Sequence, residues 1–281
     1  MVTKQIESFR VPSEAVDIIA GTPIKLTLRD GRRPLVGGPQ IEFQIGPGGI
    51  ATATCTLGFA AVRGGVEGFV TNSHCSRTRG AVDSGRYWQA FRPLFDNDQV
   101  GTETADRPMW TGGSCPTGRT CRLSDANFVD THDGVAIGRG SLARPPFGTL
   151  NWNGTDLYRI NAADFTEVDR TVLKVGRTTG LTAGVVWGTC FNTNVADSNH
   201  TMICQDIATY DSDSGDSGSP VFELTNSPLA NDVKLVGINW GSGELSNGQQ
   251  IAVLSPFPWV WFELGYEYGV DVLVCTSVYF C

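Results

Sequence analysis

Short runs in which apolar and polar positions alternate recur along most of the chain, and polar or glycine-rich turns separate them. Alternation with a period of two places every second side chain on one face, which is the pattern of a half-buried β-strand. The pattern predicts strands over residues 40–45, 51–62, 68–71, 87–91, 127–129, 134–137, 156–160, 171–175, 182–190, 202–210, 220–223, 233–240 and 250–254. Strands of this length at this spacing favour an all-β barrel or sandwich.

Two regions depart from the alternating pattern. Residues 256–265 begin with proline and end with glycine, and they are the one segment that predicts a helix. Residues 76–114 are rich in Arg, Asp, Gly and Thr, and they predict a set of exposed loops and edge strands.

Pro145 and Pro146 predict an extended connector, because proline lacks the backbone donor that a central strand needs. We therefore divide the chain into a first half, 34–145, and a second half, 146–281. Residues 1–33 are an N-terminal extension, in which the alternating run 24–28 reads as a strand.

The composition narrows the class of partner. A content of 34 glycines and 14 prolines suits short strands and many turns. A net charge of −8 argues against nucleic acid or an anionic membrane as partner, because both would repel an acidic protein. No apolar run reaches the roughly 18 residues that a membrane helix needs, so we expect no membrane association.

Ser217 lies in the hexapeptide Gly-Asp-Ser-Gly-Ser-Pro at 215–220. A serine hydroxyl is a weak nucleophile and needs a base within hydrogen-bonding reach. His74 ends a small polar turn after an apolar strand, and Asp125 opens another apolar stretch. The order His, Asp, Ser along the chain is that of chymotrypsin and differs from the orders of subtilisin and the α/β-hydrolases.

Residues 71–75, 125–129 and 215–220 together resemble the motifs of the chymotrypsin-like serine endopeptidases. Residues 33–38 and 174–182, with the ending Gly-Ser-Pro of the nucleophile motif, resemble the microbial secreted branch of that superfamily. The resemblance implies two six-stranded antiparallel β-barrels with a short helix after the last strand. It also implies a monomer that acts on proteins or peptides without a cofactor or a metal.

The resemblance gives each motif residue a role. Ser217 attacks the scissile carbonyl, His74 accepts and returns the proton, and Asp125 orients the imidazole. The backbone amides of Gly215 and Ser217 form the oxyanion hole. Asp130 and Asp133 are the alternatives to Asp125 as the third member of the triad.

Three other polar residues need separate interpretations. His132 and His200 are interpreted as ordinary surface histidines in polar loops. Asp216, directly before the nucleophile, needs a compensating charge if it is buried. In the animal enzymes of this family a newly cut N-terminus supplies that charge. Here the Leu-Val-Gly-Gly segment at 35–38 directly follows Pro34 and lies within the chain, so we expect an internal partner for Asp216.

The chain has eight cysteines and no Cys-x-x-Cys motif, which favours disulfides over a zinc or redox site. Pairing between neighbours along the sequence is our hypothesis among many possible connectivities, and the resemblance supports its first pair. The pairs are Cys55–Cys75, Cys115–Cys121, Cys190–Cys204 and Cys275–Cys281. Because disulfides persist in oxidising compartments, we expect a secreted, extracellular protein.

Substrate specificity is predicted from residues near the nucleophile. Asp211 stands at the offset of the acidic pocket floor in trypsin-like members, and Asn239, Trp240 and Gly241 resemble the pocket wall. A buried carboxylate there favours Arg or Lys before the cut bond, whereas a solvated loop charge at Asp211 would not. The rivals to a peptidase are a catalytically silent binding protein on the same fold and an esterase.

Overall fold

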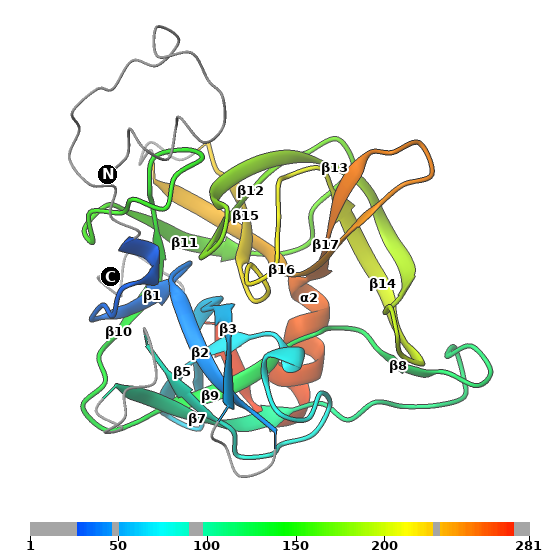
Figure 1. The fold of residues 1–281 in the computed structure, drawn as a ribbon, viewed down its shortest axis with the longest axis horizontal. Coiled ribbons are helices and arrows are strands. Elements are labelled where there is room, and N and C mark those ends of the chain that lie inside the picture. The colour runs from blue at the N-terminus through cyan, green and yellow to red at the C-terminus, as the bar shows by residue number, and fades with distance from the viewer. Residues whose placement is uncertain (1–26, 47–50, 90–97, 227–230, 273–281) are drawn as a thin grey trace, which may run out of the picture.

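The computed structural model describes residues 27–46, 51–89, 98–226 and 231–272. These residues form two mostly antiparallel sheets, one of eight strands and one of ten, which lie one below the other in Figure 1. No helix within these ranges is long and apolar enough to span a bilayer.

The first sheet is built around an apolar interior. Its strands in spatial order are β18 (Val270–Val272), β4 (Phe59–Arg63), β5 (Val66–Thr71), β9 (Asn127–Thr131), β7 (Gln99–Asp106), β6 (Arg86–Trp88), β2 (Gln40–Ile45) and β3 (Ala51–Thr56). Ile41, Phe69 and Val129 are buried together in this interior. Gly64 and Gly65 close the hairpin between β4 and β5 with φ of +57° and +85°, a conformation that glycine adopts without strain.

The second sheet draws strands from both halves of the sequence. Its strands in spatial order are β1 (Leu35–Gly37), β10 (Ile137–Ala143), β11 (Leu157–Ala163), β16 (Asp232–Glu244), β15 (Pro220–Leu224), β12 (Thr171–Gly176), β13 (Gly180–Asn194), β14 (His200–Ala208) and β17 (Gln250–Pro256). A further strand, β8 (Thr120–Arg122), pairs with β14 in parallel. Val172, Val186, Val221 and Val236 are buried between these strands.

The C-terminal helix starts directly after Pro256, as α2 (Phe257–Val260), and continues as a π-helical turn, η4 (Trp261–Tyr266). Phe257 makes an edge contact with Phe59 of β4 at a centroid distance of 6.1 Å. Buried apolar helix residues join a core that contains side chains from both sheets. The helix thereby holds the two sheets together where they meet (Figure 1).

The all-β architecture with two barrels and a short C-terminal helix is confirmed, and extra short strands enlarge both sheets. Several local expectations are wrong. The predicted strand 51–62 is two strands, β3 and β4, and residues 134–136 precede β10 instead of forming a strand. Residues 99–106, assigned to exposed loops and edge strands, form β7 between β6 and β9. Thr27–Arg29 forms a 3-10 turn instead of a strand. Leu28 packs into the core there, and its backbone amide donates a hydrogen bond to Leu150 O at 3.1 Å. Residues 24–26 lie outside the described residues.

Candidate active site

His74 lies in η3 (Ser73–Cys75), a short turn directly after β5, and it contacts the carboxylate of Asp125. His74 Nδ1 and Asp125 Oδ2 are 2.7 Å apart, and the His74 amide donates to Asp125 Oδ1 at 3.0 Å. The Asp125 side chain is fully buried, whereas 23% of the His74 side chain is exposed. The two bonds orient the imidazole and leave Nε2 for proton exchange with another group.

Cationic neighbours keep Asp125 ionised. Burial alone would raise the pKa of Asp125, but the charges of His74 and Arg79 and the hydrogen bond from His74 hold that pKa below its usual value. Arg79 Nη2 lies 3.5 Å from Asp125 Oδ2, the same oxygen that faces His74. Asp125 is therefore a carboxylate at neutral pH and can stabilise a protonated His74.

The loop that carries Asp125 is held from several sides. Asn72 Nδ2 donates to Asp125 O at 2.6 Å, and the Asp125 amide donates to Ser255 Oγ at 2.9 Å. Glu263, from the C-terminal helix, accepts from the Ser124 amide at 2.8 Å and from the Ser124 hydroxyl at 2.7 Å. The C-terminal helix therefore holds the loop of Asp125 as well as closing the core.

Arg122 links the turn of His74 to the loop of Asp125. Its guanidinium is fully buried, with Nη1 at 2.5 Å from Asp106 Oδ1 and Nε at 3.5 Å from Glu263 Oε2. Nη1 also donates to Ser73 Oγ at 2.8 Å, and Nη2 donates to Ala126 O at 2.8 Å. Because Ser73 precedes His74 and Ala126 follows Asp125, one arginine fixes both neighbours of the pair.

Ser217 lies in a turn between two glycines with positive φ, +96° at Gly215 and +90° at Gly218. Thr56, next to Cys55 in β3, holds this turn through two hydrogen bonds. Its amide donates to Ser217 O at 2.8 Å, and its hydroxyl donates to Gly215 O at 2.9 Å. Within the described residues, the Ser217 hydroxyl and the amides of Gly215 and Ser217 form no hydrogen bond. These three groups are the ones that nucleophilic attack and oxyanion binding require.

Asp216 is fully buried and pairs with Lys174 of β12, which is also fully buried, at a distance of 3.0 Å between Nζ and Oδ2. The Thr178 amide donates to Asp216 Oδ1 at 2.8 Å, and the Thr179 hydroxyl donates to Oδ2 at 2.6 Å. Burial lowers the pKa of Lys174 from its ordinary value, against the charge of Asp216. The expected internal partner of Asp216 is therefore Lys174.

Of the predicted pocket residues, Asn239 is hydrogen-bonded to the segment that leads to Ser217. Asn239 Nδ2 donates to Ser212 Oγ at 3.0 Å, whereas Trp240 Nε1 turns away to Gln205 Oε1 at 2.9 Å. The space around Gly241 is open, with no atom within 4 Å of an added Cβ. Asp211 is exposed, so the expectation of a buried carboxylate at this position is wrong and the alternative of a solvated charge agrees with the structure.

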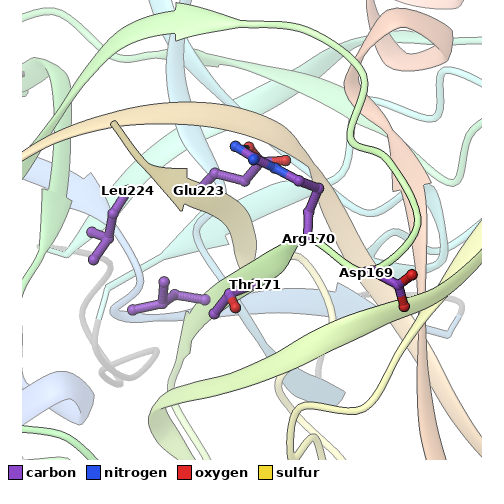
Figure 2. Close-up of a pocket in the computed structure, with 6 residues that line it drawn as sticks. Asp169, Arg170, Thr171, Glu223 and Leu224 are labelled. Carbon is purple, nitrogen blue, oxygen red and sulfur yellow. Dashed lines mark hydrogen bonds and ion pairs between the residues drawn. The ribbon is translucent and has the colours of Figure 1, made fainter. Parts of the chain in front are cut away.

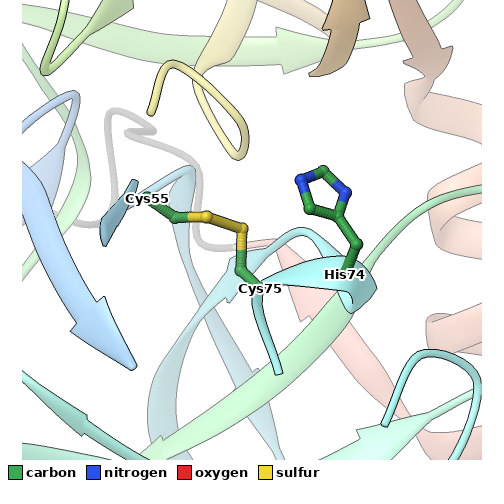
Figure 3. Close-up of side chains that lie close together, drawn as sticks. All are labelled: Cys55, His74 and Cys75. Atoms are coloured by element: carbon green, nitrogen blue, oxygen red, sulfur yellow. A yellow bond between two sulfur atoms is a disulfide. The ribbon is translucent and has the colours of Figure 1, made fainter. Parts of the chain in front are cut away.

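Three of the four predicted disulfides are present: Cys55–Cys75, Cys115–Cys121 and Cys190–Cys204. The fourth pair, Cys275–Cys281, lies outside the described residues. Figure 3 shows the Cys55–Cys75 bridge beside His74, under the yellow turn that precedes β15. Both sulfurs next to His74 are oxidised, so this cluster offers no thiolate to a metal.

The other two histidines lie outside the His74–Asp125 pair. His132 is exposed and contacts Gln99 and Thr102 through Nε2 at 3.1 Å each. His200 is half-buried, and its Nδ1 lies 2.6 Å from Thr120 Oγ1 across β8 and β14.

A pocket on the second sheet is lined by Asp169, Arg170, Thr171, Leu173, Glu223 and Leu224 (Figure 2). Arg170 and Lys234 both pair with Glu223 there, at 3.1 Å and 3.2 Å. The pocket contains no nucleophile with an adjacent base, so the candidate active site is the one at His74 and Asp125.

The sequence pattern had identified the motif residues but missed their supports, which include Thr56, Lys174, Arg122 and Glu263. One signal was available for Lys174, a single cation within the apolar run Val-Leu-Lys-Val of a predicted strand. A buried lysine in such a position needs an anionic partner.

The trypsin family model matches residues 165–260, a range that contains Ser217 and Asp216 but not His74 or Asp125. No curated protein matches the sequence. The chain resembles Thermobifida fusca protease A with 19% identity and a TM-score of 0.55, over 85% of this chain and 98% of that one. It resembles Cellulomonas bogoriensis chymotrypsin with the same identity, score and shares of coverage.

A third similar structure is described as a glutamic acid specific serine protease that uses a histidine triad in substrate binding. It shares 23% identity and a TM-score of 0.57 with this chain, over 85% of this chain and the whole of that one. Similarity to solved structures at these sequence identities shows the fold alone, and the trypsin-family match adds a sequence relation across residues 165–260.

Proposed function

We propose that this chain, which carries a trypsin-family domain on the chymotrypsin-like fold of bacterial serine proteases, is a secreted serine endopeptidase that cleaves proteins or peptides. The family match and the fold support a serine endopeptidase. The observation that carries the proposed mechanism is the pairing of a part-exposed His74 with a buried, ionised Asp125.

In the proposed mechanism, His74 Nε2 removes the hydroxyl proton of Ser217 as its oxygen attacks the scissile carbonyl. The new C–O bond converts the carbonyl into a tetrahedral oxyanion, which accepts from the amides of Gly215 and Ser217. His74 then returns the proton to the leaving amine, the C–N bond breaks, and an acyl-enzyme remains on Ser217. Water then attacks the acyl-enzyme through the same steps, with His74 again accepting and returning the proton, and the carboxylic acid product leaves Ser217.

Asp125 supports both half-reactions. Its Oδ2 accepts from Nδ1 of His74, so the ring presents Nε2 as the acceptor and gains stabilisation when it becomes cationic. Lys174 neutralises Asp216 inside the protein, so the nucleophile turn needs no cation from a newly cut N-terminus.

The finer part of the proposal is cleavage after Arg or Lys. Its remaining support is the open space at Gly241, since the exposed Asp211 does not supply the buried carboxylate on which this preference was first argued. Exposed carboxylates would attract a basic side chain more weakly than a buried one. A matched peptide set that varies only at the residue before the bond, applied to wild type and Asp211→Ala, tests this preference.

The test of the proposed function is Ser217→Ala against the matched variant Ser214→Ala, which removes an exposed hydroxyl in the same turn. We expect Ser217→Ala to abolish peptide hydrolysis and labelling by a fluorophosphonate, and Ser214→Ala to retain both. Full turnover in purified Ser217→Ala would refute the nucleophile. A wild type that neither labels nor cleaves would favour a silent binding protein, and turnover of esters alone would favour an esterase.

A further inference from the structure

The two amides assigned to the oxyanion hole belong to peptide groups whose carbonyls are bonded on the opposite side. The Ser214 carbonyl shares its peptide with the Gly215 amide, and it accepts from the Thr178 hydroxyl at 2.8 Å. The Asp216 carbonyl shares its peptide with the Ser217 amide, and it accepts from the Ser219 amide at 3.0 Å. In a planar trans peptide the N–H points away from the C=O, so each carbonyl bond sets the direction of one oxyanion donor.

The two peptides differ in how firmly they are held. The Asp216 carbonyl accepts a second bond, from Asn239 Nδ2 at 3.2 Å, and the Asp216 side chain is locked in its buried pair with Lys174. Ser214, by contrast, is exposed, and Gly215 has a φ of +96° and no side chain to restrict its rotation. Rotation of the Ser214–Gly215 peptide would turn a carbonyl, in place of an N–H, toward the oxyanion.

Thr178 is oriented for this contact from both sides. Arg177 Nη1 donates to Thr178 Oγ1 at 3.2 Å, and a guanidinium has no acceptor, so the hydroxyl proton of Thr178 is directed to Ser214 O. Arg177 is itself held by Gln40, with Nε donating to Oε1 at 2.7 Å. The Thr178 amide is anchored on Asp216 Oδ1, so the backbone that carries the hydroxyl rests on the buried ion pair.

We propose that Thr178 is a positioning residue that keeps the oxyanion hole assembled by holding the Ser214 carbonyl away from it. Thr178 does not touch the reacting atoms; it acts through the peptide that presents the Gly215 amide. This inference rests on the proposed function, since it concerns the oxyanion hole of the same site. It predicts that loss of the Thr178 hydroxyl weakens binding of the transition state and leaves binding of the substrate unchanged.

The experiment compares Thr178→Val, Thr178→Ala and Thr178→Ser with Thr225→Val. Thr225 is half-buried like Thr178, and its hydroxyl donates to a backbone carbonyl of the same sheet, Asp232 O at 3.0 Å, away from the nucleophile turn. Thr178→Val keeps the side-chain volume, whereas Thr178→Ser keeps the hydroxyl. Circular dichroism and fluorophosphonate titration establish the folded, reactive fraction of each preparation.

We expect Thr178→Val and Thr178→Ala to lower kcat by about tenfold to a hundredfold, somewhat less than loss of an oxyanion donor, with KM unchanged. Affinity for a peptide boronate, which binds as a tetrahedral adduct, should fall by the same factor as kcat. Thr178→Ser and Thr225→Val should retain kcat within about twofold, well inside the effect of a lost donor.

Two results would overturn the inference. One is a kcat within twofold of wild type in folded Thr178→Val or Thr178→Ala. The other is a loss that Thr178→Ser does not restore or that Thr225→Val reproduces, which would make the effect one of packing. If Thr178→Val does not fold, the Ala and Ser pair decides. Failure of the proposed function is distinguishable, because the wild type itself would then show no hydrolysis.

Discussion

The buried carboxylates Asp125 and Asp216 both belong to the proposed active site but are compensated in different ways. Asp216 has one buried cation, Lys174, with Nζ at 3.0 Å, and the pair is sealed at 0% exposure. Asp125 belongs to a larger cluster in which Arg122 faces Asp106 and Glu263, and Arg79 lies at the edge. A one-to-one ion pair can hold a turn rigid. In a cluster with more acids than bases, the charge balance and the stability depend on which acids are protonated.

The difference agrees with the separate roles that the proposed mechanism gives to the two carboxylates. In that mechanism Asp216 only has to hold the turn of Ser217, so full neutralisation by Lys174 is sufficient. Asp125 must respond when His74 gains a proton, so its own charge has to remain available to the imidazole. Arg122 accordingly bonds Asp106, Ser73 and Ala126 around Asp125 and leaves the Asp125 carboxylate to His74 and Arg79.

Breaking the one-to-one pair should have the largest effect. Lys174→Met leaves Asp216 buried without a cation, so we expect a loss of about 3 to 5 kcal/mol in unfolding free energy and loss of most activity. Urea denaturation and peptide hydrolysis measure the two. The control Lys234→Met, which removes a part-exposed ion pair with Glu223, should cost at most about 1 kcal/mol. Equal effects of both variants would refute the role given to Lys174.

Loosening the cluster at Glu263 should have a smaller effect. In Glu263→Gln, one of the two carboxylate oxygens that accept from the amides of Leu123 and Ser124 becomes an amide nitrogen and can no longer accept. We expect a loss of about 1 to 3 kcal/mol in unfolding free energy and a lower kcat at unchanged KM. Glu267→Gln, at a part-exposed pair with Arg107, is the matched control. Wild-type kcat in Glu263→Gln would contradict positioning of Asp125 by the helix.

The surplus of acids should make stability depend on pH. Burial raises the pKa of Glu103 to about 8, above its ordinary value of 4.5, and Asp106 adds to the shift. Between these two values the folded state keeps a proton that the unfolded state releases. The contribution of Glu103 to the free energy of unfolding is therefore fully present below about pH 4.5 and is lost as the pH rises toward 8. The slope should stay below about 1.4 kcal/mol per pH unit, one proton's worth. Urea unfolding at several pH values measures it, and Glu103→Gln should flatten the dependence; an equally steep slope in that variant would contradict the assignment.

Replacing Arg79, at the edge of the Asp125 cluster, should have the smallest effect, on the pH dependence of activity. Because His74 must be neutral to accept a proton, kcat/KM should rise with pH as the imidazole loses its proton. Arg79 competes with a protonated His74 for Asp125 Oδ2, at 3.5 Å and 2.7 Å respectively. Arg79→Gln should therefore move this rise to higher pH. A rate that falls as the pH rises from acid to neutral, in a folded wild type, would refute the role of His74.

The fold was largely predictable because half-buried strands leave a period of two in the sequence, and β2 coincides with its predicted bounds. β7 was missed because buried positions in it are acidic: Glu103 and Asp106 are each 1% exposed. Alternation of apolar residues cannot signal a strand whose inward side chains pair with distant polar groups. The 3-10 turn at Thr27–Arg29 was mispredicted for the related reason that a contact with Leu150 overrides local pattern.

The motif residues His74, Asp125 and Ser217 could be named from the sequence, because their chemistry demands particular residue types in short local contexts. Their supports could not be named in this way. Thr56, Lys174, Thr178 and Glu263 act through hydrogen bonds and charges between segments remote in sequence, and only folding brings these together. By itself the sequence determined the strand pattern and the candidate reactive groups. The tertiary structure decided which buried charges meet and which way each peptide donor points, because both depend on long-range contacts.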